Sequence, residues 1–140
     1  MHRVSIMHSM ETTANRTKVF IVDDSVVIRE RLVEMIQGLP ETQVVGEAVS
    51  ATDAVSGILH THPDCVVLDL QLQNSSGLAV LREIHPILPD VVFMVLTNHG
   101  STQHSRLCMA AGAQYFFDKS ADVEQVLDVI AGIAARRRCH

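Results

Sequence analysis

The sequence has 140 residues, a length that suits one domain with its own hydrophobic core and leaves little room for a second. Hydrophobic residues make up 47% of the chain and charged residues 19%, an ordinary globular balance. The formal net charge of −5 argues against a nucleic-acid-binding surface, which needs clustered lysine and arginine. The longest apolar runs, such as 91–96, are far too short to span a bilayer.

The sequence has an odd number of cysteines, namely Cys65, Cys108 and Cys139. No two of them have the spacing of a metal site. Cys65 lies in an apolar run and is typical of a small core residue. We therefore expect no structural disulfide, a reducing compartment and a cytoplasmic location. No continuous apolar segment occupies the N-terminus, so no secretory signal is expected.

The first 17 residues mix polar side chains with methionine and histidine and show no sustained period, which predicts a mobile leader over 1–17. An apolar run then predicts a first strand over 19–22, which ends at Asp23 and Asp24. Apolar residues at helical spacing predict a first helix over 28–39, stopped by a nearby glycine and proline.

A weaker strand is predicted over 44–48, followed by a helix over 51–59 that a capping box opens at Ser50. The next run, 65–68, is continuously apolar and ends at Asp69. Runs of this kind are typical of a central strand that is covered on both faces.

After a predicted loop over 71–76, apolar residues indicate a third helix over 78–84. Another buried strand, over 91–96, ends at Thr97. A fourth helix is predicted over about 101–111, where a glycine stops it.

A fifth strand over 115–117 ends near Lys119, and Ser120 is expected to cap a fifth helix with an apolar stripe over 123–134. Only a basic tail, 136–140, follows, so no output domain is expected.

Strands and helices therefore alternate five times, which predicts a parallel sheet with helices on both faces. The sequence predicts one α/β domain over 18–135, between the leader 1–17 and the tail 136–140.

In open α/β sheets, ligands bind beyond the carboxyl ends of the strands. The residues predicted at those ends are Asp23, Asp24, Asp69, Thr97 and Lys119. Three neighbouring carboxylates need a counter-charge, which a hard divalent cation such as Mg²⁺ and the lysine can supply. Since a carboxylate can accept phosphate covalently in such a pocket, we expect Asp69 to take up a phosphoryl group. Taken singly, each of these residues is more typical of a helix cap, a turn or a solvated side chain.

Over about residues 18–135, the chain resembles the receiver domain of bacterial two-component response regulators. The residues that carry this resemblance, at the spacing of the family, are Asp23, Asp24, Asp69, Gly77, Thr97 and Lys119. The resemblance implies a five-stranded doubly wound parallel sheet of the flavodoxin-like order 2-1-3-4-5. It also implies that the domain takes phosphate from a phosphohistidine on a sensor histidine kinase or phosphotransfer protein.

Carried over by position, the resemblance makes Asp69 the phospho-acceptor. Asp24 becomes the main side-chain ligand of Mg²⁺, and Asp23 acts through water. The backbone carbonyl of Gln71 becomes the third protein ligand.

The resemblance further implies that Thr97 and Lys119 bind phosphoryl oxygens, and that Thr97 and Phe116 form a switch. The signal then leaves through the surface of the fourth helix, fifth strand and fifth helix, read by an unidentified downstream protein or by homodimerisation. Direct DNA binding, membrane association and enzymatic turnover beyond self-phosphorylation and self-dephosphorylation are not expected.

Four residues depart from the commonest family pattern, namely Gln73 in place of Pro, Phe116 in place of Tyr, Ser120 in place of Pro and Asn98 in place of a small residue. Without proline, a cis bond before Ser120 would cost about 2.5–4 kcal/mol, so the geometry of that loop is left open. Asn98 is expected to crowd the approach to the acceptor. Gln71, Asn98 and His99 are the positions expected to tune access and phosphate lifetime.

Three other functions are weighed against this one. A Mg²⁺-dependent phosphatase with an Asp nucleophile needs a second Asp two residues later, where Gln71 stands. A flavodoxin-like cofactor binder needs a phosphate-cradling loop after the first strand, where Asp23 and Asp24 repel anions. A receiver-shaped module that works without phosphorylation is favoured mildly by Asn98 and opposed by the intact acidic set.

Overall fold

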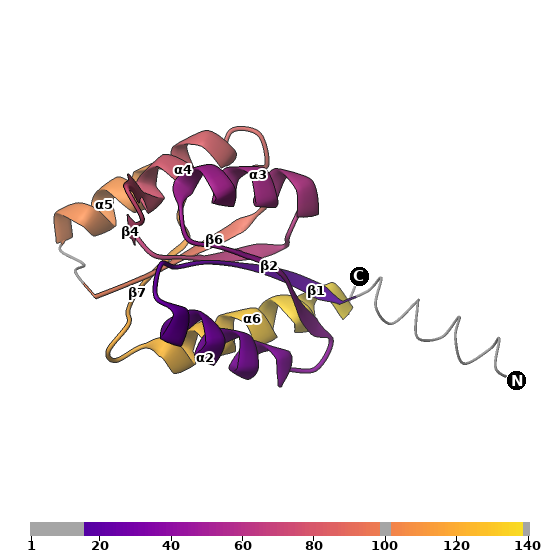
Figure 1. Ribbon diagram of the computed structural model, residues 1–140. Coiled ribbons are helices and arrows are strands. Elements are labelled where there is room, and N and C mark those ends of the chain that lie inside the picture. The colour runs from indigo at the N-terminus through magenta and orange to yellow at the C-terminus, as the bar shows by residue number, and fades with distance from the viewer. Residues whose placement is uncertain (1–15, 99–101, 139–140) are drawn as a thin grey trace, which may run out of the picture.

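The computed structural model describes residues 16–98 and 102–138, so most of the predicted leader and His99 lie outside the described residues. Five parallel strands form one sheet with helices on both faces (Figure 1). The strands are β1 (Thr17–Val22), β2 (Thr42–Ala48), β3 (Cys65–Leu68), β6 (Val92–Thr97) and β7 (Tyr115–Asp118). Their order, β2-β1-β3-β6-β7, confirms the predicted 2-1-3-4-5 topology, because β4 and β5 form a separate hairpin.

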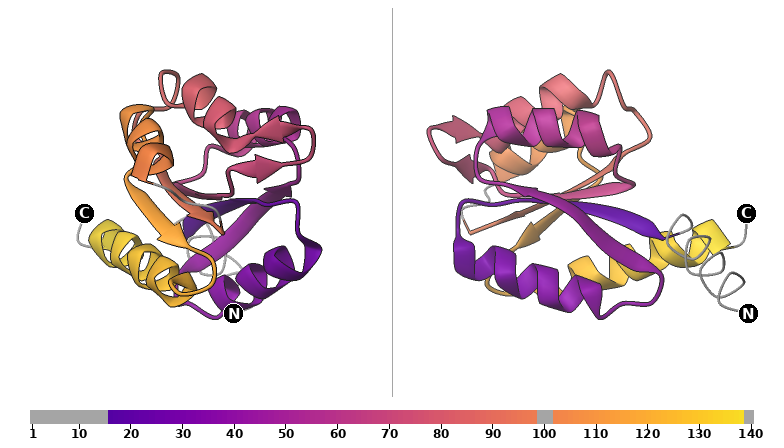
Figure 2. Two further views of the ribbon diagram at one scale, coloured as in Figure 1. Left: turned by 90° about the vertical axis from the view of Figure 1, so that its left-hand side faces the viewer. Right: turned by 45° about the vertical axis from the view of Figure 1, so that its right-hand side comes forward.

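Two layers of helices enclose the sheet. The helices are α2 (Val26–Gln37), α3 (Ala51–Thr61), α4 (Gly77–Ile84), α5 (Thr102–Ala110) and α6 (Val123–Arg138). Figures 1 and 2 show α2 and α6 against one face of the sheet and α3, α4 and α5 against the other. Alternation along β1 divides the core accordingly, since Val19 and Ile21 pack toward α2 and α6 whereas Phe20 and Val22 pack toward α3 and α4.

Serine caps begin three of the helices shortly after a strand ends. Ser25 accepts a hydrogen bond from the Ile28 N–H, and Ser50 accepts one from the Asp53 N–H. Ser76 likewise accepts from the Leu78 N–H at the start of α4. Each hydroxyl satisfies an amide that the first helical turn leaves without an internal partner.

The predicted loop after Asp69 is instead a short antiparallel hairpin. Strands β4 (Gln71–Leu72) and β5 (Ser75–Ser76) are joined by two residues, and Asn74 takes a left-handed φ of 52°. The Gln73 N–H donates to the Val49 carbonyl at 3.1 Å, which ties the hairpin to the end of β2. Two-residue strands are too short to show a period of two, so the sequence pattern did not indicate them.

Helix α6 differs from its prediction at both ends. It begins at Val123, so Ser120 does not cap it; the Ser120 hydroxyl donates to Asp118 instead. It continues through Arg138, so the three arginines assigned to the tail are helical. The Arg137 guanidinium pairs with Asp64 at 2.8 Å and fixes the end of the helix to the start of β3.

Within residues 16–98 and 102–138, no helix combines the length and apolarity that crossing a membrane requires. Cys65 and Cys108 are both buried free thiols.

Candidate functional site

The register between β1 and β3 brings Asp23 and Asp69 together. Val22 of β1 pairs with Leu68 of β3, so Asp23 and Asp69 leave neighbouring strands at the same edge of the sheet. The Asp69 N–H donates to the Val22 carbonyl at 2.9 Å, which continues the ladder by one step. Both aspartates are buried despite their position at the strand ends.

The same edge receives Thr97 and Lys119 from the other side of β3. Thr97 ends β6 and pairs with Asp118 of β7, and the Lys119 N–H donates to the Thr97 carbonyl at 3.1 Å. Thr97 is also buried. The predicted convergence of strand-end residues is therefore present in the structure.

Lys119 lies at the centre of the charged cluster. Its ammonium is 2.6 Å from Oδ2 of Asp23 and 2.8 Å from Oδ2 of Asp69. Asp24 is exposed, but one carboxylate oxygen from each of Asp23, Asp24 and Asp69 lies within 4.8 Å of the others. Three carboxylates and one ammonium leave two negative charges in excess.

This pocket fits a hard divalent cation. Carboxylate oxygens are the ligands that Mg²⁺ prefers, and an excess of two negative charges matches its charge. Asp23, Asp24 and Asp69 would hold such an ion, with the backbone carbonyl of Gln71 as the further predicted ligand. The Gln71 N–H already donates to Oδ1 of Asp69 at 3.3 Å, so Gln71 lies directly beside Asp69.

Burial and neighbouring charges shift the pKa values of Asp23 and Lys119 in opposite directions. Burial raises the pKa of Asp23, and hydrogen bonds from Lys119 and the Ser25 N–H offset that rise only in part. For Lys119, burial lowers the pKa, but hydrogen bonds and charges from Asp23 and Asp69 outweigh it and leave the pKa raised. The lysine therefore stays charged, while the ionised form of Asp23 is costly without a cation.

We expect Asp23→Asn to stabilise the metal-free protein and to reduce its stabilisation by Mg²⁺. Because the folded pKa of Asp23 lies above its ordinary value, the folded state binds more protons, and stability falls as pH rises from about 3.8 through the raised pKa. At neutral pH a neutral isostere removes this cost, so Tm should rise by a few degrees without Mg²⁺. Thermal unfolding with and without Mg²⁺ tests this.

The exposed Asp128 on α6 provides the matched control, since Asp128→Asn removes one charge from a residue outside the carboxylate cluster. With and without Mg²⁺, the free energy of unfolding of this variant should stay within about 0.5 kcal/mol of the wild-type value. A fall in metal-free Tm for Asp23→Asn would contradict the argument.

Arg29 is a site residue that the sequence analysis missed. Its Nη1 donates to the Asp23 carbonyl at 2.7 Å, and its Nε pairs with Glu47 at 3.3 Å. The side chain is only 15% exposed, so this charge-assisted bond helps to fix the turn that carries Asp23. Its place about one helical turn after the cap Ser25 is the only sequence signal that could have indicated it.

Side-chain hydrogen bonds hold the loop that carries Lys119. Oδ1 of Asp118 accepts from the Ser120 N–H at 2.8 Å and from the Ser120 hydroxyl at 2.6 Å. Asp122 in turn accepts from the Asp118 N–H at 3.0 Å. No cis peptide occurs in the described residues, so the bond before Ser120 is trans.

The other predicted positions surround this pocket. Phe116 is half-buried and packs against the core on the α3–α5 face. Gln71 and Asn98 are exposed. The roles assigned to these three residues, and to His99 outside the described residues, stay predictions.

Comparison with known proteins agrees with this geometry. The family model of the response regulator receiver domain matches residues 19–131, and the chain belongs to this family. A two-component response regulator of the LuxR family from Aurantimonas sp. SI85-9A1 has a solved structure with a TM-score of 0.79, at 30% identity, over 87% of this chain and 87% of that one.

Two curated relatives are longer proteins. The DNA-binding transcriptional activator DevR/DosR of Mycobacterium tuberculosis is 32% identical over 86% of this chain and 55% of its own length. A protein-glutamate methylesterase/protein-glutamine glutaminase of Carboxydothermus hydrogenoformans is 38% identical over 81% of this chain and 34% of its own length. The chain thus spans only part of these relatives, and it is a receiver domain of two-component systems.

Proposed function

We propose that Asp69 accepts a phosphoryl group from a phosphohistidine on a sensor histidine kinase or phosphotransfer protein. The observation that carries this proposal is the Lys119 ammonium between Asp23 and Asp69, inside a cluster of three carboxylates. In the transfer, the phosphorus–nitrogen bond breaks, its electron pair stays on the imidazole, and a phosphorus–oxygen bond to the Asp69 carboxylate forms.

The chain's own residues would position and neutralise the transferred group. When bound at Asp23, Asp24 and Asp69, Mg²⁺ would neutralise charge on the phosphoryl oxygens. The Lys119 ammonium would pair with one phosphoryl oxygen, and the Thr97 hydroxyl would donate a hydrogen bond to another. Such transfer depends mainly on positioning and charge neutralisation, which this pocket is arranged to supply.

We expect acetyl phosphate and Mg²⁺ to add one phosphoryl group to the full chain. Intact-mass spectrometry measures the addition, and borohydride reduction followed by peptide mapping locates it, because an aspartyl phosphate is reduced to homoserine. Chelation with EDTA should prevent labelling, since the three carboxylates then lack their counter-charge. Labelling at another residue, or labelling that survives EDTA, would show that the pocket does not act in this way.

This labelling experiment and a separate assay of p-nitrophenyl phosphate hydrolysis distinguish the alternatives. No labelling at any Mg²⁺ concentration would favour a receiver-shaped module that works without phosphorylation. Sustained hydrolysis of p-nitrophenyl phosphate would favour a phosphatase. We propose neither, and assign no turnover beyond loss of phosphate from Asp69 itself, with Gln71, Asn98 and His99 setting the rate of that loss.

We further propose that phosphorylation changes the surface made by α5, β7 and α6. Phe116 lies on β7 opposite Val95 of β6, two residues before Thr97, so a shift of Thr97 can reach its ring. Leu107 and Met109 are exposed hydrophobic residues on α5, which suits a surface that a protein partner or a second copy contacts.

Amide NMR spectra with Mg²⁺ and beryllofluoride should therefore change across α5, β7 and α6, and not only around Asp69. Thr97→Ala should remove the distant changes, because its side chain cannot donate to the phosphoryl mimic. Changes confined to the pocket, or unaltered in Thr97→Ala, would contradict this switch.

The mycobacterial relative is a DNA-binding transcriptional activator, and this chain spans 55% of that protein's length. We assign no direct DNA contact to the chain and place its action in a reducing cytoplasm, a location that the buried free thiols of Cys65 and Cys108 support.

A further inference from the structure

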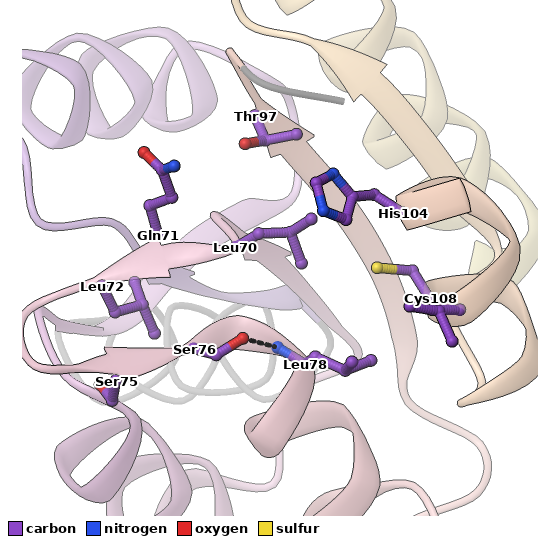
Figure 3. Close-up of a pocket in the computed structure, with 10 residues that line it drawn as sticks. Leu70, Gln71, Leu72, Ser75, Ser76, Leu78, Thr97, His104 and Cys108 are labelled. Atoms are coloured by element: carbon purple, nitrogen blue, oxygen red, sulfur yellow. Dashed lines mark hydrogen bonds between the residues drawn. The ribbon is translucent and has the colours of Figure 1, made fainter. Parts of the chain in front are cut away.

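A cavity of about 400 Å³ lies beside the phosphorylation site, between the β4–β5 hairpin, the start of α4, the end of β6 and helix α5 (Figure 3). This volume falls within the range of pockets that bind small molecules, about 300–1,000 Å³. The cavity is separate from the carboxylate cluster, since neither Lys119 nor any of the three aspartates lines it.

One side of the cavity is apolar. The residues that form this side are Leu70, Leu72, Leu78, Leu107 and Cys108. Figure 3 shows Leu70, Leu72, Leu78 and Cys108 around a common space. Cys108 is only 1% exposed, so the thiol belongs to the interior wall and not to the outer surface.

The other side of the cavity is polar. Thr97, Gln71 and His104 line it, and the described lining residues include no lysine, arginine, aspartate or glutamate. The hydroxyls of Ser75 and Ser76 already take part in hydrogen bonds within the hairpin and at the cap of α4. A charged ligand would therefore find no lysine, arginine, aspartate or glutamate to pair with among these residues, and it would lose hydration on entry.

We propose that this cavity binds a small uncharged amphiphile, with its apolar body against the leucines and a hydroxyl or carbonyl group toward Thr97. The apolar wall supplies affinity through burial, and the polar side supplies orientation. This binding does not require a phosphoryl group on Asp69.

Occupancy of the cavity opposes phosphorylation of Asp69, and this part rests on the proposed function. Thr97 lines the cavity and is also the residue proposed to bind a phosphoryl oxygen. A ligand packed against Thr97 holds the side chain in its present position, whereas a phosphoryl group on Asp69 draws the hydroxyl toward itself. The two events therefore compete, and the effect must be reciprocal.

Phenol is the probe, because it is an uncharged ring with one hydroxyl, and benzoate is the charged control. Titration of the full chain with leucine methyl groups labelled for NMR should give saturable shifts at Leu70, Leu72 and Leu78 with phenol and none with benzoate. Intermolecular NOEs from the phenol ring to these methyl groups test the location in the unmodified protein. Absence of saturable shifts, or NOEs to methyl groups elsewhere, would overturn the proposal.

Cys108→Leu should fill the cavity and weaken phenol binding at least about tenfold, since it adds apolar volume to the interior wall. Ala110→Leu is the matched control, because Ala110 is exposed on the same helix and should leave binding unchanged. Equal phenol affinity in a folded Cys108→Leu would also overturn the site; should this variant fail to fold, the NOEs decide.

A second titration, with Mg²⁺ and beryllofluoride present, tests the competition. Phenol affinity should fall roughly fivefold or more, within the usual range of coupling between sites. Unchanged affinity in a protein that responds to beryllofluoride would overturn the coupling. No response to beryllofluoride in the absence of phenol would contradict the proposed function and leave the binding site in place.

Discussion

Replacing Asp69 with asparagine should abolish phosphoryl labelling by acetyl phosphate, with a loss beyond the detection limit of intact-mass spectrometry. An amide does not offer the carboxylate oxygen that must form the new bond to phosphorus. The shape is nearly conserved, and the single amide oxygen can still accept a hydrogen bond from Lys119, whereas the amide nitrogen replaces the oxygen that accepts from the Gln71 N–H. The expected loss is therefore one of chemistry and not of folding.

Asp64→Asn is the matched control for this variant. Asp64 directly precedes β3 and Asp69 directly follows it, so the two carboxylates lie at opposite ends of one four-residue strand. Asp64 accepts hydrogen bonds from the Lys18 N–H and from Arg137, away from the pocket. Its replacement should leave labelling at the wild-type level. Persistent labelling of Asp69→Asn would mean that another residue is the acceptor.

The strands and the site residues at their ends were predictable from the sequence where an apolar run was long or was followed by a chemically unusual residue. The run 65–68 is apolar throughout, and all four residues are buried in the central strand β3. Asp23 and Asp69 each follow such a run, Lys119 follows the apolar residues 115–117 with one residue between, and parallel pairing brings the ends of neighbouring strands together. The Lys119 ammonium lies 2.6 Å from the Asp23 carboxylate and 2.8 Å from the Asp69 carboxylate because the strand order brings these residues together and their charges are opposite.

Features that depend on single side-chain contacts were not predictable in this way. The bond from Arg29 to the Asp23 carbonyl requires the exact path of the turn between β1 and α2. The β4–β5 hairpin depends on one left-handed residue, Asn74, and on bonds to Val49 and Ala51 that are distant in sequence. The end of α6 depends on Arg137 reaching Asp64, 73 residues away. None of these contacts produces a periodic signal.

Gly77→Ala should destabilise the domain and impair the proposed phosphorylation site together. A Cβ at position 77 would lie 2.2 Å from the carbonyl oxygen of Asp69, and this neighbour is backbone that cannot rotate away. Position 77 cannot easily move either, since its N–H donates to the Leu70 carbonyl at 2.9 Å and it opens α4. Relief therefore requires displacement of the Asp69 backbone, and with it the Asp69 carboxylate. The expected loss of stability is about 1–3 kcal/mol, the range for overpacked interiors.

Gly132→Ala distinguishes this clash from the general effect of adding a methyl group. Gly132 lies within α6, and the nearest atom to a Cβ there is Nη1 of Arg136 at 3.6 Å, an ordinary contact. Since alanine favours the helical backbone, this variant should gain about 0.5–1 kcal/mol. Urea unfolding measures both changes, and the rate of labelling by acetyl phosphate should fall in Gly77→Ala but stay unchanged in Gly132→Ala. A Gly77→Ala protein as stable and as rapidly labelled as wild type would show that the close approach of α4 to Asp69 does not hold the acceptor in place.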